Sequence, residues 1–211
     1  MKNKRRICEV PDCDTPSATH YFRFCRLHQN RFTRTGHPLG KMVRRSQLKQ
    51  EIARADEQLQ VYRSRPAVQA ALEWTHKLLT TYDLREVELS NQMQRLHTRG
   101  VTAYEMLCAL YALWIYKTEQ NHRLPDDARL TFACAGIALR LRAIDRRPTP
   151  GGHTTEQYVR RETRLRLGMM IREVLFPLFH QMYRFHLGQH ERELELRKRI
   201  ANFDESATVV T

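Results

Sequence analysis

Three cysteines and one histidine lie close together near the start of this 211-residue chain. They are Cys8, Cys13, Cys25 and His28, in the spacing Cys-x4-Cys-x11-Cys-x2-His. Thiolate sulfur and imidazole nitrogen are the donors that hold structural Zn²⁺, which takes four of them in a tetrahedron. Two close pairs separated by a loop are a usual way for one small segment to supply all four. The pattern therefore predicts a structural zinc site with no position left for a substrate.

The identity of the fourth ligand has alternatives. His20 and His37 lie near the same cysteines and could take the place of His28. We favour His28 because Cys-x2-His is a standard ligand pair. The alternative to any metal site is that the cysteines are ordinary thiols in a flexible basic arm.

The remaining cysteines bear on the cellular compartment. Cys108 and Cys134 lie in apolar runs, and the total of five is odd. No apolar stretch follows the basic residues 1–6, so no signal peptide is expected. Without an even disulfide framework, a reducing environment and a cytoplasmic location are expected.

Positive charge is concentrated at the N-terminal end. The formal net charge is +13, and residues 1–54 hold thirteen Lys and Arg against four acidic residues. Such a segment attracts polyanions, with an affinity that falls steeply with salt as condensed counterions are released. Arg outnumbers Lys by 29 to 7, and guanidinium groups suit phosphate oxygens and guanine edges, although a coding bias toward Arg is an alternative explanation. Nucleic acid is the expected partner.

Three short segments within residues 6–40 carry a resemblance to a known module. They are CEVPDC (8–13), FCRLH (24–28) and RFTRTGHP (31–38). Together they resemble the short zinc finger at the N-termini of phage HNH endonucleases and of other small proteins of phages and mobile elements. The resemblance implies a zinc-stabilised DNA-binding module in which Arg31 and Arg34 contact the DNA backbone. Two departures are the long loop between Cys13 and Cys25, and His37 where an acidic residue is common.

The catalytic part of an HNH nuclease is not evident in the sequence. Such a nuclease needs a His general base, a metal-binding His or Asp and an orienting residue on a ββα unit, whereas the chain after residue 42 reads as successive helices. No nucleophile elbow, Walker loop, dinucleotide fingerprint or His-Glu-x-x-His motif occurs either. We therefore predict no catalytic residue, with a divergent nuclease using His153 or His186 as an alternative.

The remainder of the chain carries helical patterns. Pro66 suits a first helical turn, Asp83 suits an N-cap, and Thr154 with Gln157 reads as a capping box. Pro177 should kink or break its helix. Two prolines and two glycines within residues 146–152 predict a loop without regular structure. Helices are expected over residues 43–63, 66–81, 83–97, 101–116, 126–144, 154–176 and 178–203.

The predicted fold class is mainly α, with a small N-terminal zinc finger followed by an all-α helical domain. The expected boundaries are 1–42 for the zinc-binding basic module, 43–203 for the helical domain and 204–211 for a flexible tail. The apolar run 101–116 is shorter than the ~20 residues that a membrane span requires, so it is expected to form the central buried helix. Its aromatic residues Tyr111, Trp114 and Tyr116 are expected in the core and not on a base-stacking surface.

A second group of arginines surrounds the predicted loop. The free N–H groups at the following helix start would add a site for phosphate. Pairing of these arginines with Asp145, Glu156 and Glu162 is the alternative. The group comprises Arg140, Arg142, Arg146, Arg147, Arg160, Arg161, Arg164 and Arg166.

The last predicted helix offers a surface for association. Leu187, Leu194 and Ile200 lie at near-heptad spacing, so this helix could zip against a partner or a second copy, or dock on its own body. His186 and His190 lie four residues apart, but surface histidines are the favoured interpretation.

These observations predict a zinc-dependent protein that binds nucleic acid, most simply duplex DNA, as a transcription regulator or an accessory factor of a phage or mobile element. The alternative is a protein adaptor whose finger docks a partner. The residues expected to contact nucleic acid are Arg5, Arg6, Arg23, Arg26, Arg31, Arg34, Lys41, Arg44, Arg45, Arg146, Arg147, Arg160, Arg161 and Arg164.

Overall fold

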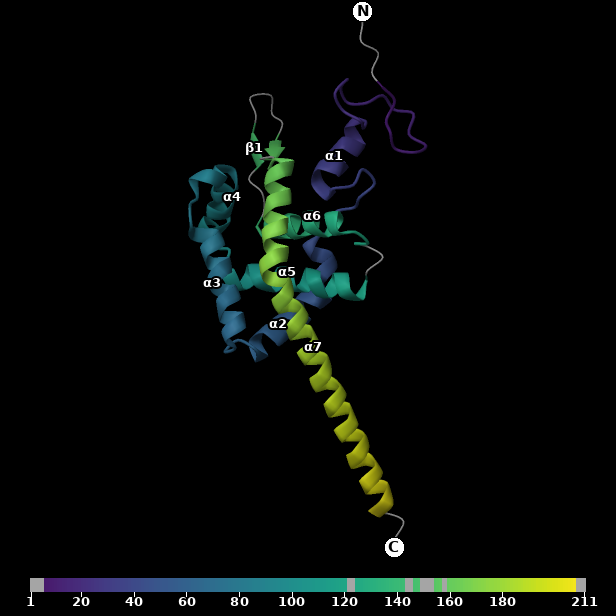
Figure 1. Ribbon diagram of the computed structural model, residues 1–211, viewed down its shortest axis with the longest axis vertical. Helices are drawn as coiled ribbons and strands as arrows, with labels where there is room; N and C mark the ends of the chain where they lie inside the picture. Colours follow the sequence, from purple (N-terminus) through teal and green to yellow (C-terminus); the bar gives the residue numbers. More distant parts are fainter. Residues whose placement is uncertain (1–5, 121–123, 143–145, 149–153, 157–158, 208–211) are drawn as a thin grey trace, which may run out of the picture.

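A computed structural model describes residues 6–120, 124–142, 146–148, 154–156 and 159–207 (Figure 1). The described residues are mainly helical, as the sequence predicts. In chain order the elements are α1 (Arg26–Thr35), η1 (Arg45–Leu48), α2 (Lys49–Val61), α3 (Pro66–Thr80), η2 (Leu84–Glu86), α4 (Val87–Thr98), α5 (Ala103–Glu119), α6 (Asp127–Ala138), β1 (Arg146–Pro148), β2 (Thr154–Glu156) and α7 (Arg161–Ala207).

Helix α5 lies at the centre of the helical elements that follow α1, which we call the body. Its N-cap, Thr102, accepts a hydrogen bond from the Glu105 N–H at 3.1 Å, and Gly100 at φ +79° provides the turn before it. Every residue from Met106 to Tyr116 is buried. Helices α2, α3, α6 and α7 all contact α5, which is why this run has no polar face. The predicted central helix and the core position of its aromatic residues are confirmed.

The segment between α6 and α7 differs from its prediction. Arg146–Pro148 pairs with Thr154–Glu156 as an antiparallel ribbon, so part of the predicted loop is a strand. Thr154 lies in β2 and does not cap a helix, and α7 begins only at Arg161. The β-branched Thr154 and Thr155 favour extended backbone, and the strand pairing gives their backbone groups partners that a helix start would have lacked.

Helix α7 does not break at Pro177. It runs for 47 residues through that proline, a length of about 70 Å at 1.5 Å per residue. Proline removes one helical hydrogen bond, but Leu175 and Phe179 on either side are fully buried, and their packing holds the two halves in one helix. The C-terminal half extends away from the other helices (Figure 1). The helix ends at Ala207, inside the predicted tail 204–211, and residues 208–211 lie outside the described residues.

The N-terminal segment has a small core of its own. Cys8, Val10, Phe24 and Cys25 are buried together, with Phe32 packed against them. This cluster is separate from the main core of the helical body. We call residues 6–40 the module, and it contacts the body where α1 packs on α6.

Two features dock the module on the body. Gly36 ends α1 at φ +75° and lies so close to Phe132 of α6 that a Cβ would come within 2.7 Å of the ring. The guanidinium of Arg161, the first residue of α7, lies 4.7 Å from the Phe32 ring centroid and 5.3 Å from that of Phe132. A cation between two rings is favourable on both faces, so Arg161 ties α1 to α6.

Candidate metal centre and nucleic-acid interface

The four predicted ligands come together in the folded chain. The ligand atoms of Cys8, Cys13, Cys25 and His28 all lie within 4.8 Å of one another. Nδ1 of His28 is 3.4 Å from the sulfur of Cys8 and 3.4 Å from that of Cys25. Tetrahedral ligands about 2.0–2.3 Å from one ion lie about 3.5 Å apart. The group therefore has the spacing and the donors to hold a metal ion.

Local structure explains how two distant pairs converge. Cys8 and Cys13 flank a tight turn, in which the Cys13 N–H donates to the Val10 carbonyl at 3.2 Å and Asp12 takes φ +61°. The second pair belongs to α1. Cys25 is its N-cap and His28 lies in its first turn, so the three-residue spacing places both side chains on one side of the helix.

The environment of the two turn cysteines differs. Burial raises the pKa of the Cys8 thiol, and backbone N–H groups of Cys25 and Val10 oppose this effect. The backbone N–H of Thr15 lowers the pKa of Cys13. A bound cation would stabilise the thiolate form of both.

The alternative histidines lie outside the cluster. Nδ1 of His37 accepts a hydrogen bond from the Leu39 N–H at 3.1 Å, and the ring of His20 packs against Tyr21 with centroids 3.6 Å apart. The cluster contains His28 instead, as the ligand spacing predicts.

A groove lies beside the metal cluster, between α1 and the chain that follows it. Its volume is about 600 Å³. We call it the basic groove because its charged lining residues are Arg31, Arg34, Lys41 and Arg44, with no acidic residue among the lining. All four are residues that the sequence predicts to contact nucleic acid. The structure brings them to one surface.

Tight packing after α1 forms the wall of this groove. The Thr35 hydroxyl lies 2.8 Å from the carbonyls of both Arg31 and His37. A Cβ on Gly40 would lie 2.1 Å from that hydroxyl. Only glycine fits there, so Gly40 allows the chain to fold back along α1 and bring Lys41 beside it.

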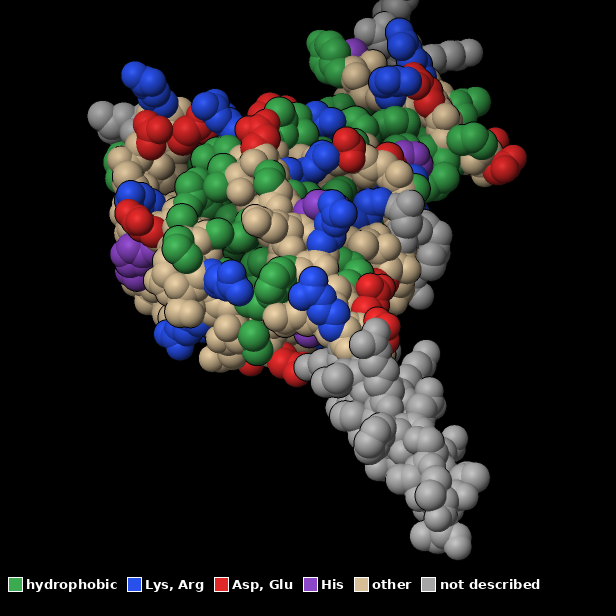
Figure 2. Space-filling model, turned by 60° about the horizontal axis from the view of Figure 1, so that its bottom comes forward, with side chains coloured by type: hydrophobic (Ala, Val, Ile, Leu, Met, Phe, Trp, Pro, Cys, Tyr) green, Lys and Arg blue, Asp and Glu red, His purple; other side chains and the backbone are tan. Residues whose placement is uncertain are grey.

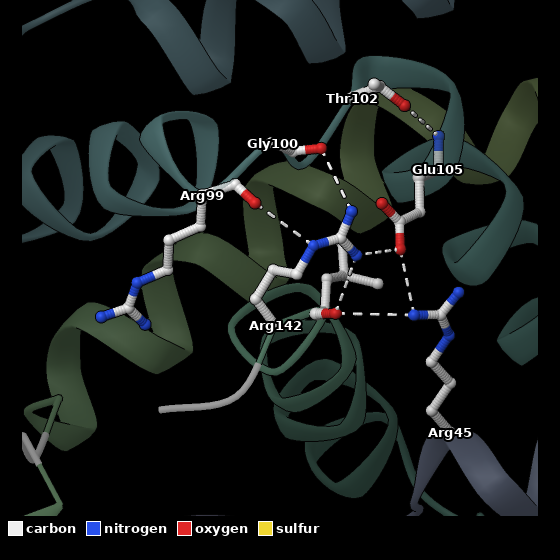
Figure 3. Close-up of polar contacts among 7 residues, drawn as sticks. Arg45, Arg99, Gly100, Thr102, Glu105 and Arg142 are labelled. Atoms are coloured by element: carbon white, nitrogen blue, oxygen red, sulfur yellow. Dashed lines mark hydrogen bonds and ion pairs between the residues drawn. The ribbon is translucent and has the colours of Figure 1, made fainter. Parts of the chain in front are cut away.

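Arg45 is not directed to the basic groove. It donates to Glu105 at 3.0 Å, and Arg142 donates to the same carboxylate oxygen. Arg142 also donates to the carbonyls of Arg99 and Gly100 at the end of α4 (Figure 3). This cluster ties η1, α4, α5 and the end of α6 together, so the ion pair gives Arg45 a structural role.

Other predicted contact residues are scattered around the module. Arg23 pairs with Glu9 at 2.6 Å, whereas Arg6 and Arg26 are exposed. Arg5 lies outside the described residues, as do the side chains of Arg146 and Arg147 on β1.

Within the predicted second arginine surface, Arg164 needs correction. Arg164 is only 6% exposed, and its Nε donates to the Val159 carbonyl at 3.2 Å. It therefore lies inside the protein and does not reach a ligand. Arg161 is held between the rings of Phe32 and Phe132. The side chain of Arg160 is exposed, 4.0 Å from Glu88, so its predicted contact with nucleic acid stays a prediction.

The start of α7 is also not open to phosphate. Glu88 of α4 accepts hydrogen bonds from the Arg160 N–H at 3.0 Å and from the Thr163 hydroxyl at 2.6 Å. A carboxylate is the natural partner of a helix N-terminus. Because Glu88 already holds this position, the expected phosphate site is filled by the protein itself.

Sequence reasoning did not single out Asn30 or Gln47, which also line the basic groove. The spacing of Arg26, Asn30 and Arg34 at four-residue steps is the signal that could have found Asn30. No sequence signal pointed to Phe132, whose contact with the module is a long-range one. Of the predicted His186 and His190 pair, His186 is partly buried, and the side chain of His190 lies outside the described residues.

Comparison with known protein families, curated proteins and solved structures finds no match to this chain. The resemblance of residues 6–40 to phage zinc fingers therefore rests on its motif alone. Among the described residues, no helix combines the length and apolar character needed to cross a membrane.

Proposed function

We propose that this protein binds nucleic acid, specifically duplex DNA, through the basic groove, and that a structural Zn²⁺ holds the groove in shape. The observation that carries the proposal is the collection of four basic side chains along one groove that has no acidic lining residue. No ion pair is recorded within the described chain for Arg31, Lys41 or Arg44. Their charges are available to DNA, since Arg and Lys bind phosphate oxygens and guanine edges well.

The helical body contrasts with this groove. There Arg54 pairs with Glu119 and Arg172 with Asp127. Figure 2 shows a face on which Lys and Arg side chains lie among acidic, hydrophobic and other side chains. These arginines of the body have acidic partners, whereas no acidic residue lines the basic groove, which favours the groove as the polyanion site.

Zinc is the metal that the donor set suits best. Three sulfurs and one nitrogen in a closed set of four are typical of structural zinc. The module core buries few side chains, so metal binding supplies much of its folding free energy. Zinc would hold the Cys8–Cys13 turn against the first turn of α1, and thereby fix the direction of that helix.

The test is a titration of a fluorescent 30-base-pair duplex with the zinc-loaded protein at several salt concentrations. We expect Lys41→Ala and Arg44→Ala each to weaken binding and to reduce the slope of log affinity against log salt by about 1. Lys77→Ala is the matched control, since Lys77 is exposed and pairs with Glu73 on α3. A wild-type protein that binds no duplex, or whose affinity does not change with salt, would contradict the proposal.

A second experiment addresses the metal. Cys25→Ser removes one ligand, so we expect zinc content and duplex binding to fall together. Elemental analysis and the same titration measure both. If the variant loses its metal and binds DNA as before, zinc has no part in the interface.

A protein adaptor remains the second candidate because the module also exposes apolar side chains. Ile7, Tyr21 and Leu39 are each at least half exposed, and such residues suit a protein partner. Partner capture that survives high salt without nucleic acid would favour this function. A role as transcription regulator or as accessory factor of a phage or mobile element stays a prediction from the resemblance of residues 6–40.

A further inference from the structure

Helix α1 has two distinct faces. His28 and Thr35 are buried, and Phe32 packs against the module core. The opposite arc spans about 140° at 100° per residue. It carries exposed Arg26, Leu27, Asn30 and Arg31, with Arg34 partly buried.

This outer face is open to a ligand. No hydrogen bond or ion pair is recorded for the side chains of Asn30 and Arg31 within the described part of the chain. Helix α1 lies at the periphery of the molecule and contacts the body through α6 (Figure 1). Its ten residues give a rod about 15 Å long, and the major groove of B-DNA, about 12 Å wide, admits an α-helix.

Both ends of α1 are fixed. A metal ion bound by Cys25 and His28 would hold its N-terminal turn. Gly36 against Phe132, with Arg161 between the rings, holds its C-terminal end. A helix anchored in this way presents its outer side chains at fixed positions, which sequence readout requires.

The basic groove would set the position of α1 on the DNA for such readout. Lys41 and Arg44 stand on the wall opposite α1, whereas Leu27, Asn30 and Arg31 belong to α1 itself. A phosphate backbone held against the Lys41 and Arg44 wall would bring the base edges of the adjacent major groove toward α1, which forms the other wall. Phosphate contacts then position the helix, and the helix contacts the bases.

We infer that α1 is a recognition helix that reads base edges in the major groove of duplex DNA. The inference rests on the proposed function and adds the residues that give sequence preference. Arg31 has the paired donors that match O6 and N7 of guanine, and Asn30 has the donor and acceptor that match N6 and N7 of adenine. Leu27 offers an apolar contact for a thymine methyl group.

The test starts with selection of preferred sites from a duplex library of random sequence, using zinc-loaded full-length protein. We expect the wild type to enrich one motif containing guanine and adenine. Arg31→Ala and Asn30→Ala should each lose preference at one base, by about 5- to 150-fold. Lys41→Ala should enrich the unchanged motif with lower affinity, because it contacts phosphate only.

A chemical probe separates base readout from a structural effect. Methylation of guanine N7 with dimethyl sulfate blocks the major-groove edge. It should weaken binding of the selected motif by the wild type and have little further effect on binding by Arg31→Ala. Zinc content and the unfolding midpoint of each variant should equal those of the wild type, since both side chains are exposed.

The outcomes distinguish a failure of DNA binding from a failure of sequence readout by α1. Absence of binding to any duplex would overturn the proposed function itself. Binding without enrichment, or an unchanged motif in both α1 variants, would overturn the recognition helix and leave the groove as a phosphate site. Tighter binding to a single strand than to the selected duplex would also overturn it, and would point to base stacking on exposed Tyr21.

Discussion

Gly36 connects the module to the helical body through a single backbone position. It caps α1 in the left-handed conformation, and its N–H donates to the Phe32 carbonyl at 2.9 Å. It also lies against the ring of Phe132. Glycine is needed there for two reasons, because a side chain would strain the backbone and would push α1 away from α6.

Comparison with Gly100 separates these two reasons. Gly100 has a similar φ of +79°, but no atom lies within 4 Å of its missing Cβ. We expect Gly100→Ala to cost about 1–2 kcal/mol from left-handed backbone strain. Gly36→Ala should cost about 1–3 kcal/mol more, from overlap with Phe132. Urea unfolding of the zinc-loaded variants measures both, and equal losses would show that the Phe132 contact yields easily.

At the scale of elements, one carboxylate joins three helices. Glu119 at the end of α5 accepts hydrogen bonds from Arg54 of α2 at 2.8 and 2.6 Å and from the Tyr183 hydroxyl of α7 at 3.2 Å. The hydrogen bonds from Arg54 lower the pKa of Glu119. Because the folded pKa lies below the unfolded value of about 4.3, this contribution to stability is present above that pH. It is lost as the pH falls through the folded pKa.

We therefore expect Glu119→Gln to reduce the free energy of unfolding at pH 7 by about 0.5–1.5 kcal/mol, because solvent screens this partly exposed ion pair. The difference from the wild type should shrink as the pH falls below 4, because the wild-type carboxyl then becomes protonated. Chemical unfolding over a pH series measures this. Glu73→Gln, which breaks an exposed pair within α3, should have a smaller effect, and a difference that persists at pH 2 would argue against the ionic origin.

At the scale of the whole molecule, two separate cores predict two responses to metal loss. The module core includes the candidate ligands Cys8 and Cys25, whereas the body core described around α5 contains none of the four. Removal of the metal leaves the small module without its main source of folding free energy. The body keeps its own buried apolar surface.

We expect a chelator to abolish hydrogen-exchange protection in α1 and to leave protection in α5 unchanged. Mass spectrometry of the exchanged protein measures both segments. Cys25→Ser should reproduce the effect of the chelator, whereas Cys108→Ser, in α5 and outside the cluster, should retain the metal. Loss of protection in α5 together with α1 would show that the docking through Phe132 makes the molecule one cooperative unit.

The sequence by itself determined the features that depend on neighbours along the chain. The ligand spacing placed Cys25 and His28 on one helical turn, and an unbroken apolar run determined that α5 is buried on every side. The prediction that a helix breaks at a proline was less reliable. The packing of Leu175 and Phe179 on either side of Pro177 overrides the local preference of proline for ending a helix.

The tertiary structure alone decided which arginines form ion pairs within the protein and which line the basic groove. Arg142 donates a hydrogen bond to Glu105, which lies 37 residues away in the sequence. The N–H of Arg160 donates to Glu88, which lies 72 residues away. A local sequence pattern does not reveal such distant partners. Composition therefore gave the number of positive charges but could not distinguish arginines in structural ion pairs from arginines without one. The fold leaves Arg31, Lys41 and Arg44 along one groove, because Gly40 turns the chain back against α1 where its missing side chain makes room.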